Sequence, residues 1–329
     1  HMYKRQRSGD LHGVPRGTAR LQRRARMRAV RRPLALLIVA LAAACGSGPA
    51  PGDGEVPTVW VAIPPQREIV ERVAGGAVHV EVLLPPGQSP ATYEATPRQL
   101  ASLEHAATYL SLGVPFETVL LPRLRSSSPG LEIVDLRRGV ELVPMDEPHR
   151  HSDEAAAGAS HGAQPDPHIW LDPVRVAQVA EATRDALCAV EPDGCGAFSS
   201  GLLAYRRELS ELDTRLDRLL APCRGHDLLV FHPAYGYLAR RYGMRQVALE
   251  ADGKPPTPRR LADIADRIDV AGQTTLFVQP QFAGAAATAA AQALGVDIVE
   301  LDPLAPDLVA NLDRMANAIA RGCGDTGGS

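Results

Sequence analysis

The sequence predicts an α/β protein with two doubly wound, parallel-sheet lobes joined by a long, rigid α-helix. Strand and helix signals alternate from residue 56 to 136, and the same alternation returns from 227 to 321. Alternation of this kind is typical of βαβ units and parallel sheets. Between the two regions, residues 197–221 carry apolar side chains at spacings of three and four, the pattern of one long amphipathic helix. A single long helix between two lobes would restrict their hinge motion.

The expected strands are short apolar runs rich in Val, Leu and Ile. In the first lobe they lie at 56–63, 78–84, 107–113 and 131–136, with helices at 66–74, 97–105 and 115–126. A further helix is expected to start near Pro173. In the second lobe we expect strands at 227–232, 245–250, 274–279 and 297–302, with helices at 234–242, 257–270, 284–294 and 307–321. The apolar face of the linking helix consists of Leu202, Tyr205, Leu209, Leu212, Leu216 and Leu219.

The composition is that of a globular protein. Of the 329 residues, 45% are hydrophobic and 22% charged, and the formal net charge is -3. Residues 1–32 are strongly basic, so the rest of the chain is more acidic than this total suggests. An acidic body argues against a nucleic-acid partner and favours attraction of cations.

The N-terminal region predicts export. Residues 1–45 are interpreted as a leader and lipoprotein signal peptide, with Met27 a plausible native start. The apolar run 33–44 is too short to cross a bilayer and ends in Leu-Ala-Ala-Ala-Cys, which resembles a bacterial lipobox. Lipidation at Cys45 would anchor the protein to the membrane, in the periplasm or on the outer face of the cytoplasmic membrane. The alternative is an ordinary cysteine near a conventional cleavage site.

The mature chain divides into four predicted segments. Residues 46–55, rich in Gly and Pro, form a flexible tether. The N-terminal lobe covers 56–196, the linking helix 197–221 and the C-terminal lobe 222–324. The N-terminal lobe includes a polar loop at 147–166 with His149, His151 and His161, which serves either as a solvated linker or as a collector of metal.

The other cysteines are even in number, as expected for disulfides in an exported chain. Cys188 and Cys195 flank a Pro-Asp-Gly turn signal, whereas Cys223 precedes a predicted strand and Cys323 follows the last helix. We therefore predict the pairs 188–195 and 223–323. A zinc site made from all of these cysteines is the alternative, although their spacing fits no common zinc finger.

Candidate ligands gather where predicted strands end. His232, Glu250, Gln279 and Asp302 each follow a strand of the second lobe, and ligands of doubly wound sheets bind at the carboxyl ends of the strands. In the first lobe, His168 stands in Asp-Pro-His-Ile-Trp-Leu-Asp-Pro, where flanking prolines would hold the imidazole. Two imidazoles and a carboxylate suit zinc and tolerate manganese, iron or nickel. Each of these residues also has a structural alternative, such as an ion pair between Glu250 and Lys254 or turn initiation by Asp302.

From about residue 56 to 320, the chain resembles the solute-binding proteins of bacterial zinc and manganese ABC importers. The resemblance rests on PPGQSPATYEATPRQL (85–100), LGVPFE (112–117), DPHIWLDP (166–173), FHPAYGYLARRYG (231–243), FVQPQF (277–282) and ELDPLAPDLVANL (300–312). It implies metal bound in the cleft between the lobes, and delivery to the membrane permease of an ABC importer.

The resemblance assigns the second, third and fourth family ligands to His168, His232 and Asp302. The first is normally the histidine of a Pro-His-x-Tyr-Glu segment, which here reads Pro-Ala-Thr-Tyr-Glu with Ala91 at the ligand position. Three candidates can fill the gap: water, a neighbour such as Glu250 or Gln281, or one of the loop histidines. We predict that His168, His232, Glu250 and Asp302 form or border the site.

These observations predict a monomeric binding protein for zinc, with manganese the alternative cargo, and no enzymatic activity. Three other functions stay open. The first is binding of a metal chelate such as a siderophore, and the second is a zinc-dependent hydrolase with Glu250 as general base. The third is a surface protein whose main role is adhesion or metal storage. Against the hydrolase, the sequence contains no HExxH or P-loop motif.

Overall fold

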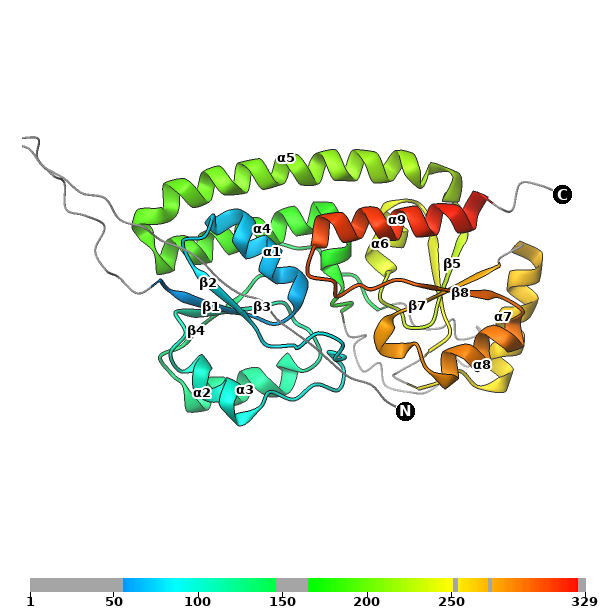
Figure 1. Ribbon diagram of the computed structural model, residues 1–329, viewed down its shortest axis with the longest axis horizontal. Coiled ribbons are helices and arrows are strands. Elements are labelled where there is room, and N and C mark those ends of the chain that lie inside the picture. The colour runs from blue at the N-terminus through cyan, green and yellow to red at the C-terminus, as the bar shows by residue number, and fades with distance from the viewer. Residues whose placement is uncertain (1–55, 146–164, 251–253, 272–273, 325–329) are drawn as a thin grey trace, which may run out of the picture. The chain divides into compact units, whose positions relative to one another are not determined.

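Two parallel sheets, each of four strands, form the framework of the protein (Figure 1). The computed structural model describes residues 56–145, 165–250, 254–271 and 274–324. The first sheet has the order β2-β1-β3-β4 and the second β6-β5-β7-β8. Their strands are β1 (Thr58–Val61), β2 (His79–Val82), β3 (Thr108–Ser111), β4 (Glu132–Asp135), β5 (Asp227–Val230), β6 (Arg245–Ala248), β7 (Thr275–Val278) and β8 (Asp297–Glu300). The predicted two-lobe α/β fold is confirmed.

The central strands are buried on both faces because helices cover both sides of each sheet. Every residue of β3, β5 and β7 is buried, which explains why these strands read as continuous apolar runs. The helices are α1 (Pro64–Ala74), α2 (Pro97–Leu103), α3 (Glu117–Ser127), α4 (Pro173–Val190), α5 (Cys195–Leu219), α6 (Gly236–Arg241), α7 (Pro258–Ala271), α8 (Ala285–Leu294) and α9 (Leu308–Gly324). In the first lobe, α2 and α3 lie on one side of the sheet, with α1 and α4 on the other (Figure 1).

Local chemistry fixes the ends of several helices. Pro64 and Pro65 occupy the first turn of α1, where their missing N–H groups leave no hydrogen bond unmade. The helix ends at Gly75, whose φ of 60° is a left-handed conformation that glycine adopts without a steric penalty. Helix α4 starts after Asp172, whose side chain accepts a hydrogen bond from the Val174 N–H.

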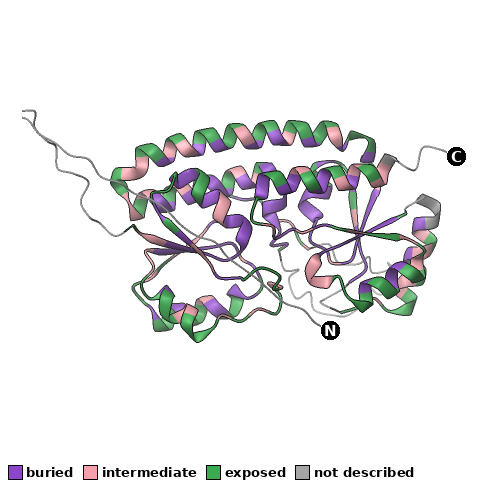
Figure 2. Ribbon diagram, viewed as in Figure 1, coloured by how far each residue is buried: buried purple, intermediate pink, exposed green. Residues whose placement is uncertain are grey.

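Helix α5 is the predicted linking helix, and it packs against α1, α4 and α9. Its buried face consists of Phe198, Leu202, Tyr205, Leu209, Leu212 and Leu216, whereas Leu219 is only partly buried. Figure 2 shows this alternation of buried and exposed positions along α5. The apolar stripe of the sequence is thus the packing face of the helix, displaced by one turn toward its N-terminus.

Helix α9 adds a second connection that the sequence did not indicate. The backbone N–H of Val309, at the start of α9, donates to Glu68 of α1 at 3.4 Å. Arg215 of α5 pairs with Asp313 of α9 at 2.7 Å. The two halves of the chain are therefore joined both by α5 and by contacts of α9 with α1 and α5. One large hydrophobic cluster includes residues from both halves of the chain.

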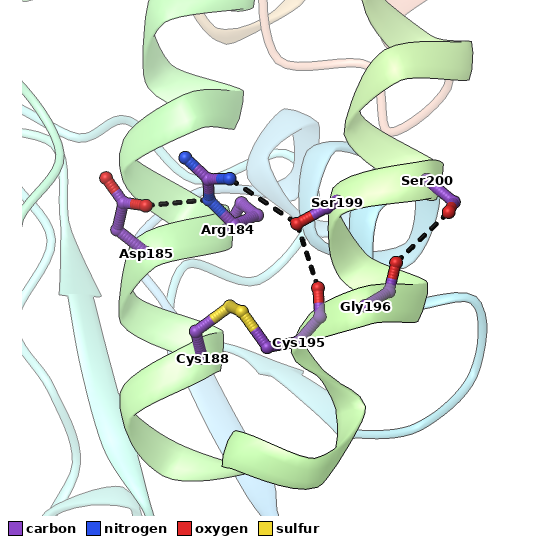
Figure 3. The surroundings of a disulfide bond; sticks show 7 residues. All are labelled: Arg184, Asp185, Cys188, Cys195, Gly196, Ser199 and Ser200. Carbon is purple, nitrogen blue, oxygen red and sulfur yellow. Dashed lines mark hydrogen bonds and ion pairs between the residues drawn. A yellow bond between two sulfur atoms is a disulfide. The ribbon is translucent and has the colours of Figure 1, made fainter.

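Both predicted disulfides are present. Cys188–Cys195 closes the turn between α4 and α5 (Figure 3), next to Arg184, which bonds to Asp185 at 2.6 Å and Ser199 at 3.4 Å. Cys223–Cys323 joins the end of the α5 region to the end of α9. Of the helices in the described ranges, none has the length and apolar character needed to span a bilayer.

The two disulfides should differ in their effect on stability. They close loops with sequence separations of 7 and 100 residues, and the entropy that a cross-link removes from the unfolded chain grows with loop length. We expect Cys223→Ala with Cys323→Ala to lower the free energy of unfolding by about 5 kcal/mol, against about 2 kcal/mol for Cys188→Ala with Cys195→Ala. Urea unfolding of the metal-free variants measures both values, and equal losses would contradict this account.

Candidate functional site

The site begins at the carboxyl edge of the second sheet. His232 follows β5, Glu250 follows β6, Gln279 follows β7 and Asp302 follows β8. Since the strand order is β6-β5-β7-β8, these side chains follow one another along the edge as Glu250, His232, Gln279 and Asp302. The sequence predicted that they share an edge, and the sheet order decides which of them are neighbours.

His232 is held by a carboxylate and an aromatic ring. Its Nδ1 lies 3.0 Å from Oε2 of Glu250, which is only 3% exposed. On its other side the imidazole stacks on Phe282, with ring centroids 4.8 Å apart and planes 14° from parallel. These contacts leave the ring little freedom to turn.

His168 has the same arrangement in the other half of the chain. Oδ1 of Asp166 lies 2.7 Å from Nδ1 of His168 and accepts the backbone N–H of the same residue at 2.9 Å. Asp166 is 1% exposed. Its own backbone is fixed by a hydrogen bond from its N–H to the Val143 carbonyl at 2.8 Å and by the Tyr237 hydroxyl, which donates to its carbonyl oxygen at 3.1 Å.

The imidazoles of His168 and His232 lie close to each other, although His168 precedes α5 in the sequence and His232 follows it. The centroids of His168 and His232 are 5.7 Å apart, with the rings nearly perpendicular. An ionised carboxylate can only accept a hydrogen bond, so opposite such a partner Nδ1 is the donor and a neutral ring keeps the lone pair of Nε2. Carboxylate-bound histidines of this kind are typical of metal sites, where the second partner fixes the tautomer and the ring orientation.

Asp302 lies further along the edge, in a polar setting of its own. Its Oδ1 accepts the Leu304 N–H at 2.9 Å and lies 3.4 Å from Nε2 of Gln281. The Asn311 amide donates to its backbone carbonyl at 2.6 Å. Burial, and next the charge of Asp302, raise the pKa of Tyr235 well above its ordinary value, so this phenol stays neutral and donates to the Leu301 carbonyl.

The predicted ligands are not all gathered at one point. Adjacent strands lie about 4.8 Å apart, so His232 and Asp302, separated by β7, start from backbones roughly 10 Å apart. Accordingly, no group of three or more His, Cys, Asp or Glu side chains among the described residues is close enough to hold a metal ion. The structure brings together His168, His232 and the carboxylates that hold them, and leaves Asp302 beside Gln281.

The other residues that the sequence singled out do not lie with the imidazole pair in the described part of the structure. Ala91 is exposed, in a turn in which its N–H donates to Oγ of Ser89. His149, His151, His161 and Cys45 lie outside the described residues. Asp166 and Phe282 were not predicted from the sequence as site residues. A signal for Asp166 was available, since an acid two residues before a histidine in Asp-Pro-His can fold back onto its imidazole.

Two parallel-sheet lobes, a long linking helix and an imidazole pair contributed from both sides of that helix define a two-lobed solute-binding protein. The family model described as ZnuA, zinc-uptake complex component A, periplasmic, matches residues 59–322. The chain belongs to this family.

Individual relatives agree with this family assignment. The chain is 30% identical over 269 residues to the high-affinity zinc uptake system protein ZnuA of Paracoccus denitrificans, covering 72% of this chain and 80% of the relative. It is 28% identical over 248 residues to the zinc-binding lipoprotein AdcA of Streptococcus pneumoniae, covering 73% of this chain but 48% of AdcA, so the chain spans about half of that protein. A crystal structure of ZnuA superposes with a TM-score of 0.74 at 31% identity, covering 82% of this chain and 100% of that chain.

Trp170 contacts residues beside two of the predicted ligands, His168 and Asp302. Its indole N–H donates to the Pro303 carbonyl at 2.7 Å, one residue from Asp302, and its ring lies 5.1 Å from that of His168. We expect Trp170→Phe to lower the free energy of unfolding by about 1–3 kcal/mol, because a buried carbonyl loses its donor and the smaller ring leaves a gap. Urea unfolding tests this, and an unchanged midpoint would contradict a stabilising role for the bond.

Proposed function

We propose that the protein captures a divalent transition metal outside the cytoplasm and delivers it to the membrane permease of an ABC importer. Zinc is the favoured cargo and manganese the alternative. The observation that carries the proposal is the His168–His232 pair, in which each Nδ1 is held by a buried carboxylate and each Nε2 is left for metal. Membership of the zinc-uptake family and similarity to the zinc uptake protein ZnuA and the zinc-binding lipoprotein AdcA support the choice of zinc.

In this proposal Nε2 of His168 and Nε2 of His232 bind the metal, and Asp302, which the structure leaves beside Gln281, moves toward them to supply the third protein ligand. Two imidazoles and one carboxylate form a donor set that zinc accepts while keeping an open position. Glu250 borders the site as the partner of His232, as Asp166 does for His168. Gln281, bonded to Asp302, positions that carboxylate, and the loop histidines 149, 151 and 161 act as accessory collectors.

The route to the membrane is part of the same proposal. Lipidation of Cys45 tethers residues 56–324 to the membrane through segment 46–55, and the protein acts as a monomer. Similarity to AdcA, a zinc-binding lipoprotein, supports the anchor. A binding protein needs no turnover, so zinc-loaded protein should not hydrolyse generic esters or phosphates.

Removal of either imidazole should abolish tight binding. We expect His168→Ala and His232→Ala each to weaken zinc binding by at least about 100-fold, more than the 10- to 100-fold cost usual for outer partners. His105→Ala, an exposed histidine at the end of α2, is the matched control and should bind as the unmodified protein does. Competition titration against a fluorescent zinc chelator measures the affinities. Unchanged affinity in His232→Ala would refute the site.

The carboxylate partners should have a smaller effect. We expect Glu250→Gln and Asp166→Asn each to weaken zinc binding by roughly 10- to 100-fold, because an amide supports the imidazole less strongly than a carboxylate. The same titration measures this loss, with thermal unfolding as the test of folding. If Glu250→Gln weakened zinc binding as much as His232→Ala, Glu250 would be a direct ligand, the other role that its place in the sequence allows.

A further inference from the structure

Tyr237 is a buried residue of α6, in the second half of the chain, whose hydroxyl bonds to two backbone groups of the first half. The hydroxyl accepts the N–H of Val143 at 3.1 Å and donates to the carbonyl oxygen of Asp166, also at 3.1 Å. The residue is only 1% exposed, so water cannot easily replace either bond. Because a phenol has a single hydrogen to donate, that hydrogen is committed to Asp166.

Asp166 passes this restraint on to His168. Its own N–H donates to the Val143 carbonyl at 2.8 Å, and Pro167 follows it, which limits the backbone angles of the residue before the proline. Oδ1 of Asp166 accepts the backbone N–H of His168 at 2.9 Å and lies 2.7 Å from Nδ1 of the same residue. A displacement of the Asp166 backbone would therefore reach the His168 imidazole directly, through the carboxylate that holds it.

The ring of Tyr237 is itself held in place, so its hydroxyl has a defined position. The Arg175 guanidinium lies over the ring, with its central carbon 4.6 Å from the centroid. Arg175 is bonded to Asp172 at the start of α4, and its Nε donates to the Glu141 carbonyl at 3.3 Å. Burial raises the pKa of the Tyr237 phenol, so the hydroxyl keeps the proton that it donates to Asp166.

The place of Tyr237 in the chain relates it to both imidazoles. It belongs to α6, the helix that follows His232, and the residues of this helix from Gly236 to Ala239 are buried. The same helix contacts the 3-10 turn Ile169–Leu171, which follows His168. One short, buried helix therefore comes directly after one imidazole and supports the other through Asp166.

We propose that Tyr237 is a positioning residue for metal binding, whose hydroxyl fixes Asp166 and, through it, the tautomer and direction of the His168 ring. This inference rests on the proposed function, in which Nε2 of His168 binds the metal. Tyr237 acts without touching the metal, since its hydroxyl is bonded to Val143 and Asp166. Without that hydroxyl, a backbone N–H and a backbone carbonyl lose their partner, and Asp166 is free to shift away from Nδ1 of His168.

The test is Tyr237→Phe in the full-length protein, a change that removes the hydroxyl and keeps the ring beneath Arg175. We expect zinc binding to weaken by about 5- to 20-fold in competition titration, at the lower end of the loss usual for outer partners of a metal ligand. Tyr242→Phe is the matched control, because Tyr242 is another buried tyrosine of the second half, and its hydroxyl donates to Asp213 of α5 at 3.1 Å. Both variants should lower the urea midpoint, and Tyr242→Phe should bind zinc as the unmodified protein does.

The tautomer of His168 supplies a readout that lost stability alone would not change. In metal-free protein at mildly alkaline pH, where an ordinary imidazole is neutral, long-range proton–nitrogen NMR spectra should place the His168 proton on Nδ1. Tyr237→Phe should shift this ring toward a mixture of both tautomers and leave His232, held by Glu250, unchanged.

Three results would overturn the inference and leave the proposed function standing. They are zinc affinities of the unmodified and Tyr237→Phe proteins that agree within about twofold, an equal loss in Tyr242→Phe, and weaker binding with an unchanged His168 tautomer. Failure of the unmodified protein to bind zinc would overturn both.

Discussion

The buried face of α5 is the constraint on which the rest of the structure depends. Six of its side chains, from Phe198 to Leu216, are buried, and the helix contacts α1 and α4 from the first half of the chain and α9 from the second. Burial of large apolar side chains contributes roughly 1.5–3 kcal/mol each, so this face opposes any separation of the helices packed on it. Because His168 comes before α5 and His232 after it, the distance between the two imidazoles depends on this packing.

The strand order then decides which ligands are neighbours. In the order β6-β5-β7-β8, Glu250 stands next to His232 and can hold its Nδ1, whereas Asp302 is two strands away. A carboxylate that neighbours an imidazole along the edge naturally becomes its hydrogen-bond partner. A carboxylate beyond the intervening Gln279 is left for other roles. The division between a partner for histidine and a candidate ligand for metal thus follows from sheet topology.

The sequence could predict the features that local pattern and burial determine. Buried parallel strands read as apolar runs, the α5 face repeats at helical spacing, and the disulfides follow from cysteines at the ends of predicted elements. His168 and His232 could be singled out as candidate ligands because each stands at the end or start of an element. Strand order, the docking of α9 on α1 and the contact of Asp166 with His168 were not predicted, because they depend on tertiary packing that no local pattern carries.

The hydrogen bonds that join the two halves lie beside the candidate ligands. The Trp170 indole, two residues from His168, bonds to the carbonyl next to Asp302, and the Tyr237 hydroxyl bonds to Asp166, which holds His168. Asp302 itself is tied through its carbonyl to Asn311 of α9, the helix whose first turn is bonded to Glu68 of α1. A change in the position of one half relative to the other would therefore move the candidate ligands with it. Conversely, a metal bound by residues of both halves adds bonds across the same contacts, so metal binding and the arrangement of the lobes are coupled by this geometry.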